Sequence, residues 1–323
     1  MSRAGDREIE IILEEAEKSG QCATPDDLRT RRLLERRLKT GELVSPMRDL
    51  FARPDYWAAL SPEQQHLHKI RALQKLHPNW TFCGASAALL HGLSVSRRHL
   101  RQINVATNSG RRNVMDEQIV NVHLNEKETC VVNGIRATSL LRTTFDCMRN
   151  MDFRDGLAVA DSALKVGGLS REDLVAYVSE KRGGYSGAPQ ARFTVRHADP
   201  RSGSGGESIA RAAMLELGFA EPELQVPMRD PFTGQKRFAD FGWRKEDGSL
   251  VLGELDGREK YVNPDMTGGA DSLDVLRAER FRESRLTVDG TAVVRFSPQD
   301  VQNDAFFARL LDRFGVPRAR PLG

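Results

Sequence analysis

Apolar residues recur at helical spacing in the N-terminal part of the chain. One such stripe, which Gly20 ends, predicts a first helix and consists of Ile9, Ile11, Ile12, Leu13 and Ala16. Residues 24–27, TPDD, combine a capping residue, a proline at the first helical position and acids in the first turn, so they predict a second, short helix. Residues 31–41, RRLLERRLKTG, predict a third helix, and residues 42–54 predict a short hairpin.

Three helices followed by a hairpin are the order of a winged helix, whose third helix is placed to enter a DNA major groove. The predicted third helix carries a basic cluster against a single acid, Glu35, and its leucines can face a core. The cluster consists of Arg31, Arg32, Arg36, Arg37 and Lys39. Arginines on an isolated amphipathic helix are more often a solvated face. Both interpretations, DNA binding and plain exposure to solvent, therefore stay open.

The region from about residue 63 to residue 200 offers little recognisable chemistry. Its pattern predicts a strand running into a small-residue helix at residues 80–95, strands at 102–107 and 119–124, and further helices from 135–150 onward. Arg142, Thr143 and Asp146 indicate a polar network or, as we favour, a helix N-terminus with satisfied side chains. No HxxxH or HExxH spacing, phosphate loop or nucleophile with an adjacent base is found.

A Gly/Ser-rich stretch at residues 196–206 predicts the last domain boundary. The helix predicted at residues 206–219 has Glu207 in its first turn, where the helix dipole alone favours an acid. Alternating runs then predict four strands, with residues 230–236 as the turn between the first two and a helix at 271–290 before the last. The strands are predicted at residues 222–228, 237–243, 249–257 and 291–298.

Three acids stand on the predicted strands. Glu254 and Asp256 are two apart behind an apolar run, so their side chains share one face of a strand. Asp240 lies between two apolar residues, where a carboxylate is costly unless it is paired or ligates something. Since neighbouring strands lie about 4.8 Å apart, Asp240 and Glu254 can share one divalent ion, the arrangement that activates water in phosphodiester hydrolysis. The alternative is a solvated turn at Asp256 and the glycine after it.

Composition bounds the class of protein. A chain of 323 residues is too long for one typical core, so two or three domains are expected, and a hydrophobic fraction of 39% excludes a disordered chain. The formal charge is only +3, so a nucleic-acid surface must come from local clustering. No signal peptide opens the chain and no apolar run could span a bilayer, so a cytoplasmic protein without a membrane partner is expected. Reduced thiols are expected for the scattered cysteines Cys22, Cys83, Cys130 and Cys147.

The C-terminal part of the chain resembles the Vsr-like branch of the PD-(D/E)XK endonuclease superfamily, which consists of small domains related to very-short-patch-repair endonucleases. The segments that carry this resemblance, in order, are GESIARAAMLELGF, ELQVPM, RFADFGW, LVLGELDGREKY, LRAERFRESRL and TAVVRF. The preceding part, with WTFCGASAALLHGL and IRATSLLRTTFDCM, resembles proteins that join an AbiEi-type antitoxin region to such a nuclease-like domain. The resemblance implies an α+β and α/β multidomain chain. Its expected domains are a winged helix at residues 1–60, an α/β middle domain at 61–200 and a restriction-endonuclease-like mixed sheet flanked by helices at 201–323.

Carried over position by position, the resemblance makes Asp240 the metal-binding aspartate and Glu254 the acid of the (D/E)XK element. Asp256 stands where the superfamily lysine is expected, a variant that the Vsr-like branch commonly follows with a histidine or another polar group. No histidine occurs after His197, so Lys260 is the cation expected to take that role. This departure leaves the general base and the transition-state cation open. Two further site candidates are Glu207 on the first helix and Gln225 on the first strand.

Two functions follow from these patterns. In the first, the protein is a DNA-binding, metal-dependent endonuclease that hydrolyses DNA phosphodiesters, with Mg2+ or Mn2+ bound by Asp240, Glu254 and Asp256, and with Lys260 balancing charge at the phosphate. In the second, it is an AbiEi-like regulator or antitoxin whose nuclease-like domain is inactive and serves DNA binding or homodimer formation. Double-stranded DNA is the expected partner in both. The expected setting is phage defence or a toxin-antitoxin system, and no toxin is identified by the chain.

Overall fold

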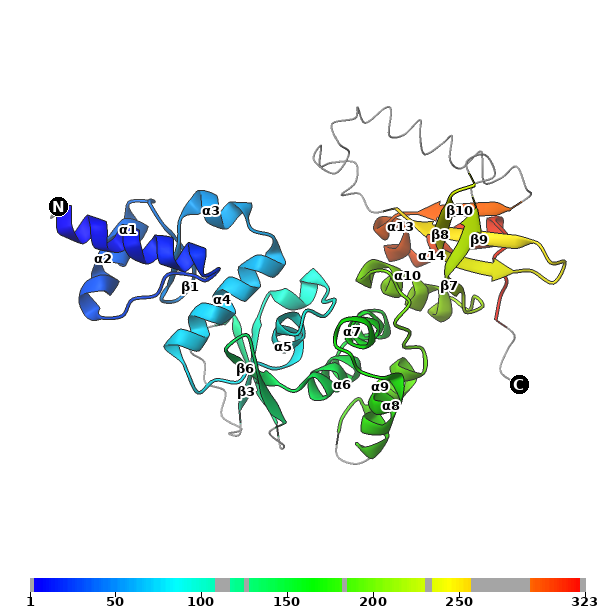
Figure 1. Cartoon of the computed structure of the whole chain (residues 1–323), viewed down its shortest axis with the longest axis horizontal. Helices are drawn as coiled ribbons and strands as arrows, with labels where there is room; N and C mark the ends of the chain where they lie inside the picture. The colour runs from blue at the N-terminus through cyan, green and yellow to red at the C-terminus, as the bar shows by residue number, and fades with distance from the viewer. Residues whose placement is uncertain are drawn as a thin grey trace, which may run out of the picture.

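The computed structural model describes residues 3–107, 117–124, 128–181, 185–229, 234–256 and 291–319. Helices at the N-terminal end, a mixed middle part and a four-stranded sheet at the C-terminal end follow one another along an elongated molecule (Figure 1). Helices beside several small sheets confirm the predicted mixed class. No helix in the described ranges is long and apolar enough to cross a membrane.

The N-terminal part has two helices before its hairpin, and the predicted second, short helix is wrong. Asp27 instead caps the second helix by accepting the Thr30 N–H at 2.7 Å, so the proline at position 25 stands before the cap. Ala23 pairs with Phe51 of the hairpin as an isolated bridge. The basic helix is therefore the second helix and not the third. The elements are α1 (Arg3–Lys18), α2 (Leu28–Lys39), β1 (Val44–Met47) and β2 (Leu50–Ala52).

The middle part is organised around Phe82, a fully buried residue that bridges Val105 on one side and Ala137 on the other. These bridges join a parallel pair of strands to an antiparallel pair, and the strand expected before the small-residue helix is reduced to this one residue. The strands are β3 (Ile103–Thr107), β4 (Ile119–His123), β5 (Thr129–Val132) and β6 (Ile135–Thr138). The helices are α3 (Pro54–Ala59), α4 (Pro62–Leu76), α5 (Gly84–Leu90) and the short 3-10 helix η1 (Arg97–Leu100).

Four helices follow the middle strands: α6 (Leu140–Asn150), α7 (Phe153–Val166), α8 (Arg171–Glu180) and α9 (Ala188–Arg196). Both interpretations of the polar residues at the start of α6 are present together. Ser139 caps the helix by accepting the Arg142 N–H at 3.3 Å, and the Arg142 Nε lies 2.7 Å from Asp146 Oδ2. Both side chains of this ion pair are buried, so each supplies the countercharge that the other needs within α6.

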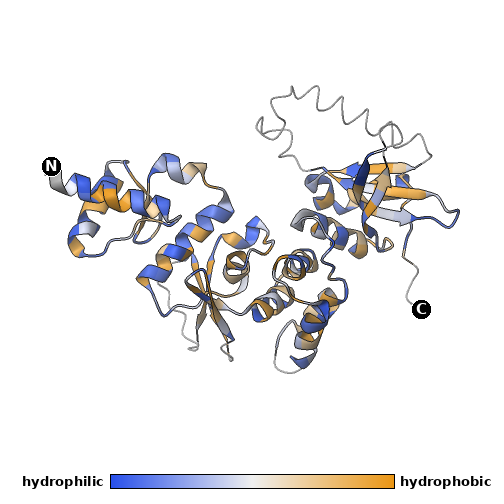
Figure 2. Ribbon diagram, in the orientation of Figure 1, coloured by the Kyte–Doolittle hydropathy of each residue, from blue (hydrophilic) through white to orange (hydrophobic). Residues whose placement is uncertain are grey.

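The C-terminal sheet has the strand order β10-β9-β8-β7. The four strands lie where the alternating pattern predicted them, and Figure 2 shows hydrophobic and hydrophilic stretches side by side in the sheet. Helix α10 and two helices after the sheet pack against one core that includes Phe219, Phe241, Phe296 and Phe307. The last two helices were not predicted, although a capping box between Ser297 and Asp300 starts the first of them. The elements are β7 (Glu223–Arg229), β8 (Lys236–Arg244), β9 (Leu250–Leu255), β10 (Ala292–Phe296), α10 (Gly205–Glu216), α13 (Pro298–Gln302) and α14 (Asp304–Arg313).

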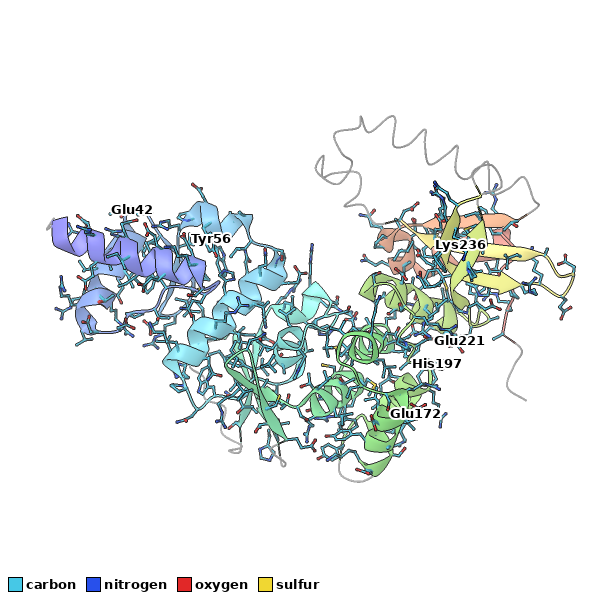
Figure 3. The ribbon with its side chains drawn as sticks, in the orientation of Figure 1. Glu42, Tyr56, Glu172, His197, Glu221 and Lys236 are labelled. Carbon is cyan, nitrogen blue, oxygen red and sulfur yellow. The ribbon has the colours of Figure 1, made fainter. Side chains whose placement is uncertain are left out.

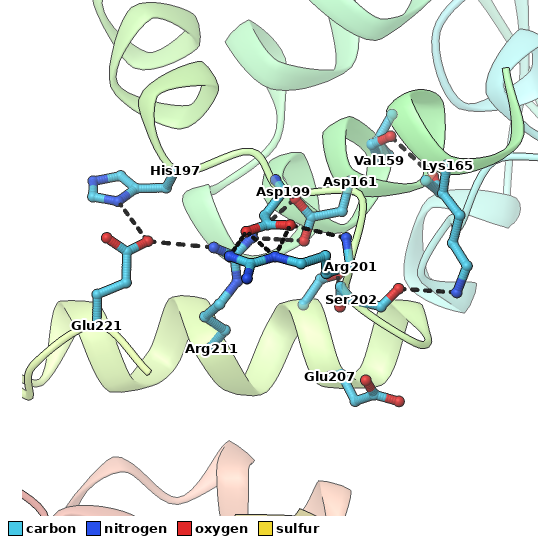
Figure 4. A network of polar contacts seen from close by, with 12 residues as sticks. Val159, Asp161, Lys165, His197, Asp199, Arg201, Ser202, Glu207, Arg211 and Glu221 are labelled. Carbon is cyan, nitrogen blue, oxygen red and sulfur yellow. Dashed lines mark hydrogen bonds and ion pairs between the residues drawn. The ribbon is translucent and has the colours of Figure 1, made fainter. Parts of the chain in front are cut away.

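The Gly/Ser-rich stretch at residues 196–206 is crossed by close contacts, because α10 packs along α7. The Arg211 Nη2 lies 2.9 and 2.8 Å from the two carboxylate oxygens of Asp161, and both side chains are almost fully buried (Figure 4). Lys165 donates to the carbonyl of Ser202 at 3.0 Å. A Cβ on Gly205 would lie 2.7 Å from the Ser94 Cβ. The glycine here permits close approach of two elements and does not serve as a spacer.

Candidate functional site

Polar residues follow one another across the C-terminal sheet. The pairing of β8 with β9 runs as far as Phe241 and Gly253, and the next residues on the two strands are Asp240 and Glu254. On the other side of β9, Glu254 is the direct register partner of Arg295 on β10. Register therefore places Asp240 and Glu254 on neighbouring strands, at the point where the regular ladder ends.

Asp240 takes part in the backbone pairing through its side chain. Its Oδ2 accepts the N–H of Leu255 at 2.8 Å, where a regular ladder would use a carbonyl of β8. A charge-assisted bond of this kind holds the carboxylate against β9. The half-buried Asp240 thus stays compatible with its apolar neighbours.

Glu254 and Asp256 meet the same guanidinium. The Arg295 Nη2 lies 2.8 Å from Glu254 Oε2, and its Nη1 lies 3.8 Å from Asp256 Oδ2. All three side chains are mostly withdrawn from solvent, with exposed fractions of 12% for Arg295, 13% for Glu254 and 27% for Asp256. Sequence reasoning missed Arg295. The signal was present, because an arginine between apolar residues of the segment TAVVRF obeys the same rule that singled out Asp240.

Gln225 has a backbone φ of 52°, in the left-handed region that is uncommon for a residue other than glycine. It breaks the alternation of β7, because Leu224 packs in the core beneath the helices whereas Val226 packs in a separate cluster with Leu252. The Gln225 Nε2 donates to Glu207 Oε2 at 3.2 Å. The strained residue therefore links β7, an edge strand of the sheet, to the first turn of α10.

Glu207 closes the N-terminus of α10. Its carboxylate accepts the Gly203 N–H at 2.7 Å and the Ser204 hydroxyl at 3.0 Å, while Ser204 Oγ accepts the Glu207 N–H at 3.3 Å. It points away from the Arg211 network on the same helix (Figure 4). Glu207 therefore stabilises the N-terminus of α10, and the hydrogen bond from Gln225 joins this end of the helix to the sheet.

The acids do not form a three-ligand cage. Among the described residues, no group of three or more His, Cys, Asp or Glu side chains is arranged to hold a metal ion. Mg2+ is, however, commonly bound through one or two carboxylates together with water and phosphate oxygens. Asp240 and Glu254 supply donors of that chemistry, so the residues fit a divalent ion that is completed by substrate. Lys260 lies outside the described residues.

The basic residues of α2 fall into two groups. Arg32, Arg36 and Lys39 are exposed, and Arg31 is partly exposed and pairs with Asp49 at 2.9 Å. These positions present positive charge to solvent on one helix, as a phosphate-binding surface requires.

Arg37 belongs to the interior of the N-terminal part. Its Nη2 lies 2.9 Å from Asp6 Oδ1 and its Nη1 lies 2.7 Å from Glu10 Oε1, both on α1. Burial works against its charge, but the hydrogen bonds with Asp6 and Glu10 outweigh burial and raise the pKa of Arg37 above its ordinary value. The structure therefore places Arg37 between the two helices and away from the exposed basic surface.

Cavities with polar lining residues also occur away from Asp240 and Glu254. One of about 630 Å3 is lined by residues of η1, α5, α6, β3 and β4, among them Arg98, Asn104 and Asp146. Another, of about 580 Å3, lies at the junction between α9 and β7, where His197 and Glu221 lie side by side (Figure 3). The His197 Nδ1 is 3.6 Å from Glu221 Oε1. Sequence reasoning found neither cavity, because their linings come from separate elements.

Comparisons with known proteins place the chain near two curated relatives of Mycobacterium tuberculosis. They are the uncharacterized protein MT2308 of strain CDC 1551 and the uncharacterized protein Rv2248 of strain H37Rv, each 29% identical over 187 residues. The matches cover 56% of this chain and 64% of each relative, so the chain spans less than two thirds of their length. No family model and no solved structure matches.

Proposed function

We propose that the protein binds double-stranded DNA and that its C-terminal sheet hydrolyses DNA phosphodiesters with the help of Mg2+ or Mn2+. The observation that carries the proposal is the position of Asp240 and Glu254, next to each other across β8 and β9 where their ladder ends. The resemblance to Vsr-like PD-(D/E)XK domains supports the same assignment of residues.

In this function Asp240 and Glu254 would hold the divalent ion. A bound ion of this kind stabilises charge on phosphate oxygens and makes a water molecule more acidic. The chain itself prepares the site, because the Leu255 N–H fixes the Asp240 carboxylate before metal or substrate arrives. Glu254 is held at the same level of the sheet by its register with β10.

The exposed basic residues of α2 support binding to DNA. Arg32, Arg36 and Lys39 occupy one helix at the far end of the molecule from the sheet (Figure 1). Contacts of such side chains with phosphates give affinity without sequence preference.

Calorimetric titration of Mn2+ and Mg2+ tests the metal, and nicking of plasmid DNA in the same samples tests the reaction. We expect wild-type protein to bind Mn2+ and nick DNA, and Glu254→Ala and Asp240→Ala to do neither while keeping their circular dichroism. Asp247→Ala, an exposed acid in the turn between β8 and β9, is the matched control and should behave as wild type. Nicking that persists in Asp240→Ala would assign the activity to a contaminant.

A second function is favoured by a specific observation. Glu254 and Asp256 already lie against the Arg295 guanidinium, and the described part of the chain contains no three-ligand cage. These features suit an AbiEi-like regulator whose nuclease-like domain only binds DNA or pairs with a second copy.

DNA binding by α2 separates the two functions. For a regulator, Arg32→Ala and Arg36→Ala should each weaken binding to promoter DNA and reduce the salt slope by about one unit per lost phosphate contact. Arg29→Ala at the start of α2, an exposed residue that pairs with Glu8, is the control and should leave the slope unchanged. Sequence-specific promoter binding without metal binding or nicking would favour the regulator.

A further inference from the structure

The site lacks a lysine two residues beyond Glu254, and Asp256 adds a negative charge at that position. We propose that Arg295 is the cation of this site: it balances Glu254 and Asp256 before metal binds and contacts the scissile phosphate during cleavage. The inference rests on the proposed nuclease function and deepens it. It assigns to β10 a role that sequence reasoning gave to Lys260.

Strand geometry holds Arg295 at the acids. β10 runs parallel to β9, and the register pairs Arg295 with Glu254 and the residues on either side with Gly253 and Leu255. The flanking Val294 and Phe296 are buried in the core beneath the helices. A side chain anchored by its own strand in this way needs little further ordering to meet a substrate.

The guanidinium of Arg295 can bind the carboxylates first and a phosphate of the substrate afterwards. Arginine is permanently charged and presents several donors in a planar fork that fits carboxylates and phosphates alike. In the structure one fork nitrogen lies 2.8 Å from Glu254 and the other lies 3.8 Å from Asp256. The fork therefore faces both carboxylates, closely at Glu254 and at a longer distance at Asp256.

Charge balance supports the same assignment. With their carboxylates ionised, Asp240, Glu254 and Asp256 carry three negative charges, and Arg295 offsets one of them. Within these four groups negative charge exceeds positive charge, so the acids can attract a divalent cation while Arg295 stays beside them.

Hydrolysis gives Arg295 its catalytic task. A water oxygen forms a bond to phosphorus while the bond to the leaving sugar oxygen breaks; the water gives up a proton to solvent, and the leaving oxygen takes one. Negative charge accumulates on the non-bridging phosphate oxygens during this exchange. A guanidinium beside Glu254 lies where it can neutralise that charge.

Arg295→Gln separates this role from a merely structural one, because its two effects have opposite signs. Removing a cation beside the acids should tighten Mn2+ binding by about tenfold in calorimetry. Loss of transition-state stabilisation should slow single-turnover nicking at saturating Mn2+ by about 100-fold or more. Arg295→Lys keeps the charge but loses the fork, so Mn2+ affinity should stay near wild type while nicking falls by about tenfold. Arg244→Gln, an exposed arginine at the other end of the β8–β9 ladder, should change neither quantity.

Thermal melting with and without Mn2+ shows whether the variants are folded. If Arg295→Gln does not fold, the Arg295→Lys variant alone tests the inference. If wild-type protein nicks DNA and Arg295→Gln has the same Mn2+ affinity and the same nicking rate, the inference is overturned but the proposed function stands. The same holds for an Arg295→Lys protein that nicks DNA as fast as wild type, or for a parallel loss of metal binding and nicking in both variants. Wild-type protein that neither binds Mn2+ nor nicks DNA overturns the proposed function and the inference with it.

Discussion

Replacing Arg211 with methionine should lower the free energy of unfolding by about 3–5 kcal/mol. The substitution keeps an apolar stem of similar length but leaves the Asp161 carboxylate, which is only 3% exposed, without its cation. The Asp199 N–H at 2.8 Å and the Ser208 hydroxyl would remain as partners, yet two neutral donors do not offset the desolvation of a buried charge. The cost should therefore be close to that of an uncompensated buried carboxylate.

Urea denaturation followed by circular dichroism measures this cost, and a double-mutant cycle assigns it to the pair. Asp161→Leu combined with Arg211→Met removes both charges and should be more stable than Arg211→Met alone. Arg201→Met is the control, because Arg201 is 64% exposed and pairs with Asp199 at the surface, so its loss should cost less than about 1 kcal/mol. An Arg211→Met protein within 1 kcal/mol of wild type, or strictly additive costs in the double mutant, would refute the view that this ion pair fastens α10 to α7.

Two further predictions concern the N-terminal half. Arg37→Ala should destabilise the protein by about 1–2 kcal/mol, because Arg37 is buried whereas its partners Asp6 and Glu10 are partly exposed. Replacement of the exposed Arg36 with alanine is the control and should change stability by less than about 0.5 kcal/mol. Equal urea midpoints for the two variants would contradict the assignment of Arg37 to the interior. Burial lowers the pKa of His66 from 6.5 to about 4, so the unfolded chain binds the proton more readily, and the stability present above pH 6.5 is lost as pH falls toward 4. The loss should amount to roughly 3 kcal/mol, and urea midpoints between pH 7 and pH 4.5 should fall less steeply in His66→Gln than in wild type.

Local sequence determined much of the C-terminal sheet and the places where helices begin. Alternation of apolar and polar residues is imposed by the backbone of a single strand, so four strands could be predicted without knowing their neighbours. The same alternation brought Glu254 and Asp256 toward one partner. At residues 24–27 the local signals were ambiguous, because a cap at Asp27 and a proline at the first helical position compete, and the cap prevailed.

Only the tertiary structure decided which charges meet. Arg295 is separated from Glu254 by 40 intervening residues, and their contact arises because β10 returns beside β9 in parallel. Arg36 and Arg37 are chemically identical neighbours, yet the turn of α2 exposes one and buries the other against α1. The glycines at the start of α10 resemble a linker in sequence, but the packing of α10 on α7 uses Gly205 for close approach. Periodicity and capping act within a few residues of chain, so they can be predicted from local sequence. The pairing of charges depends on which distant segments pack together, so only the tertiary structure reveals it.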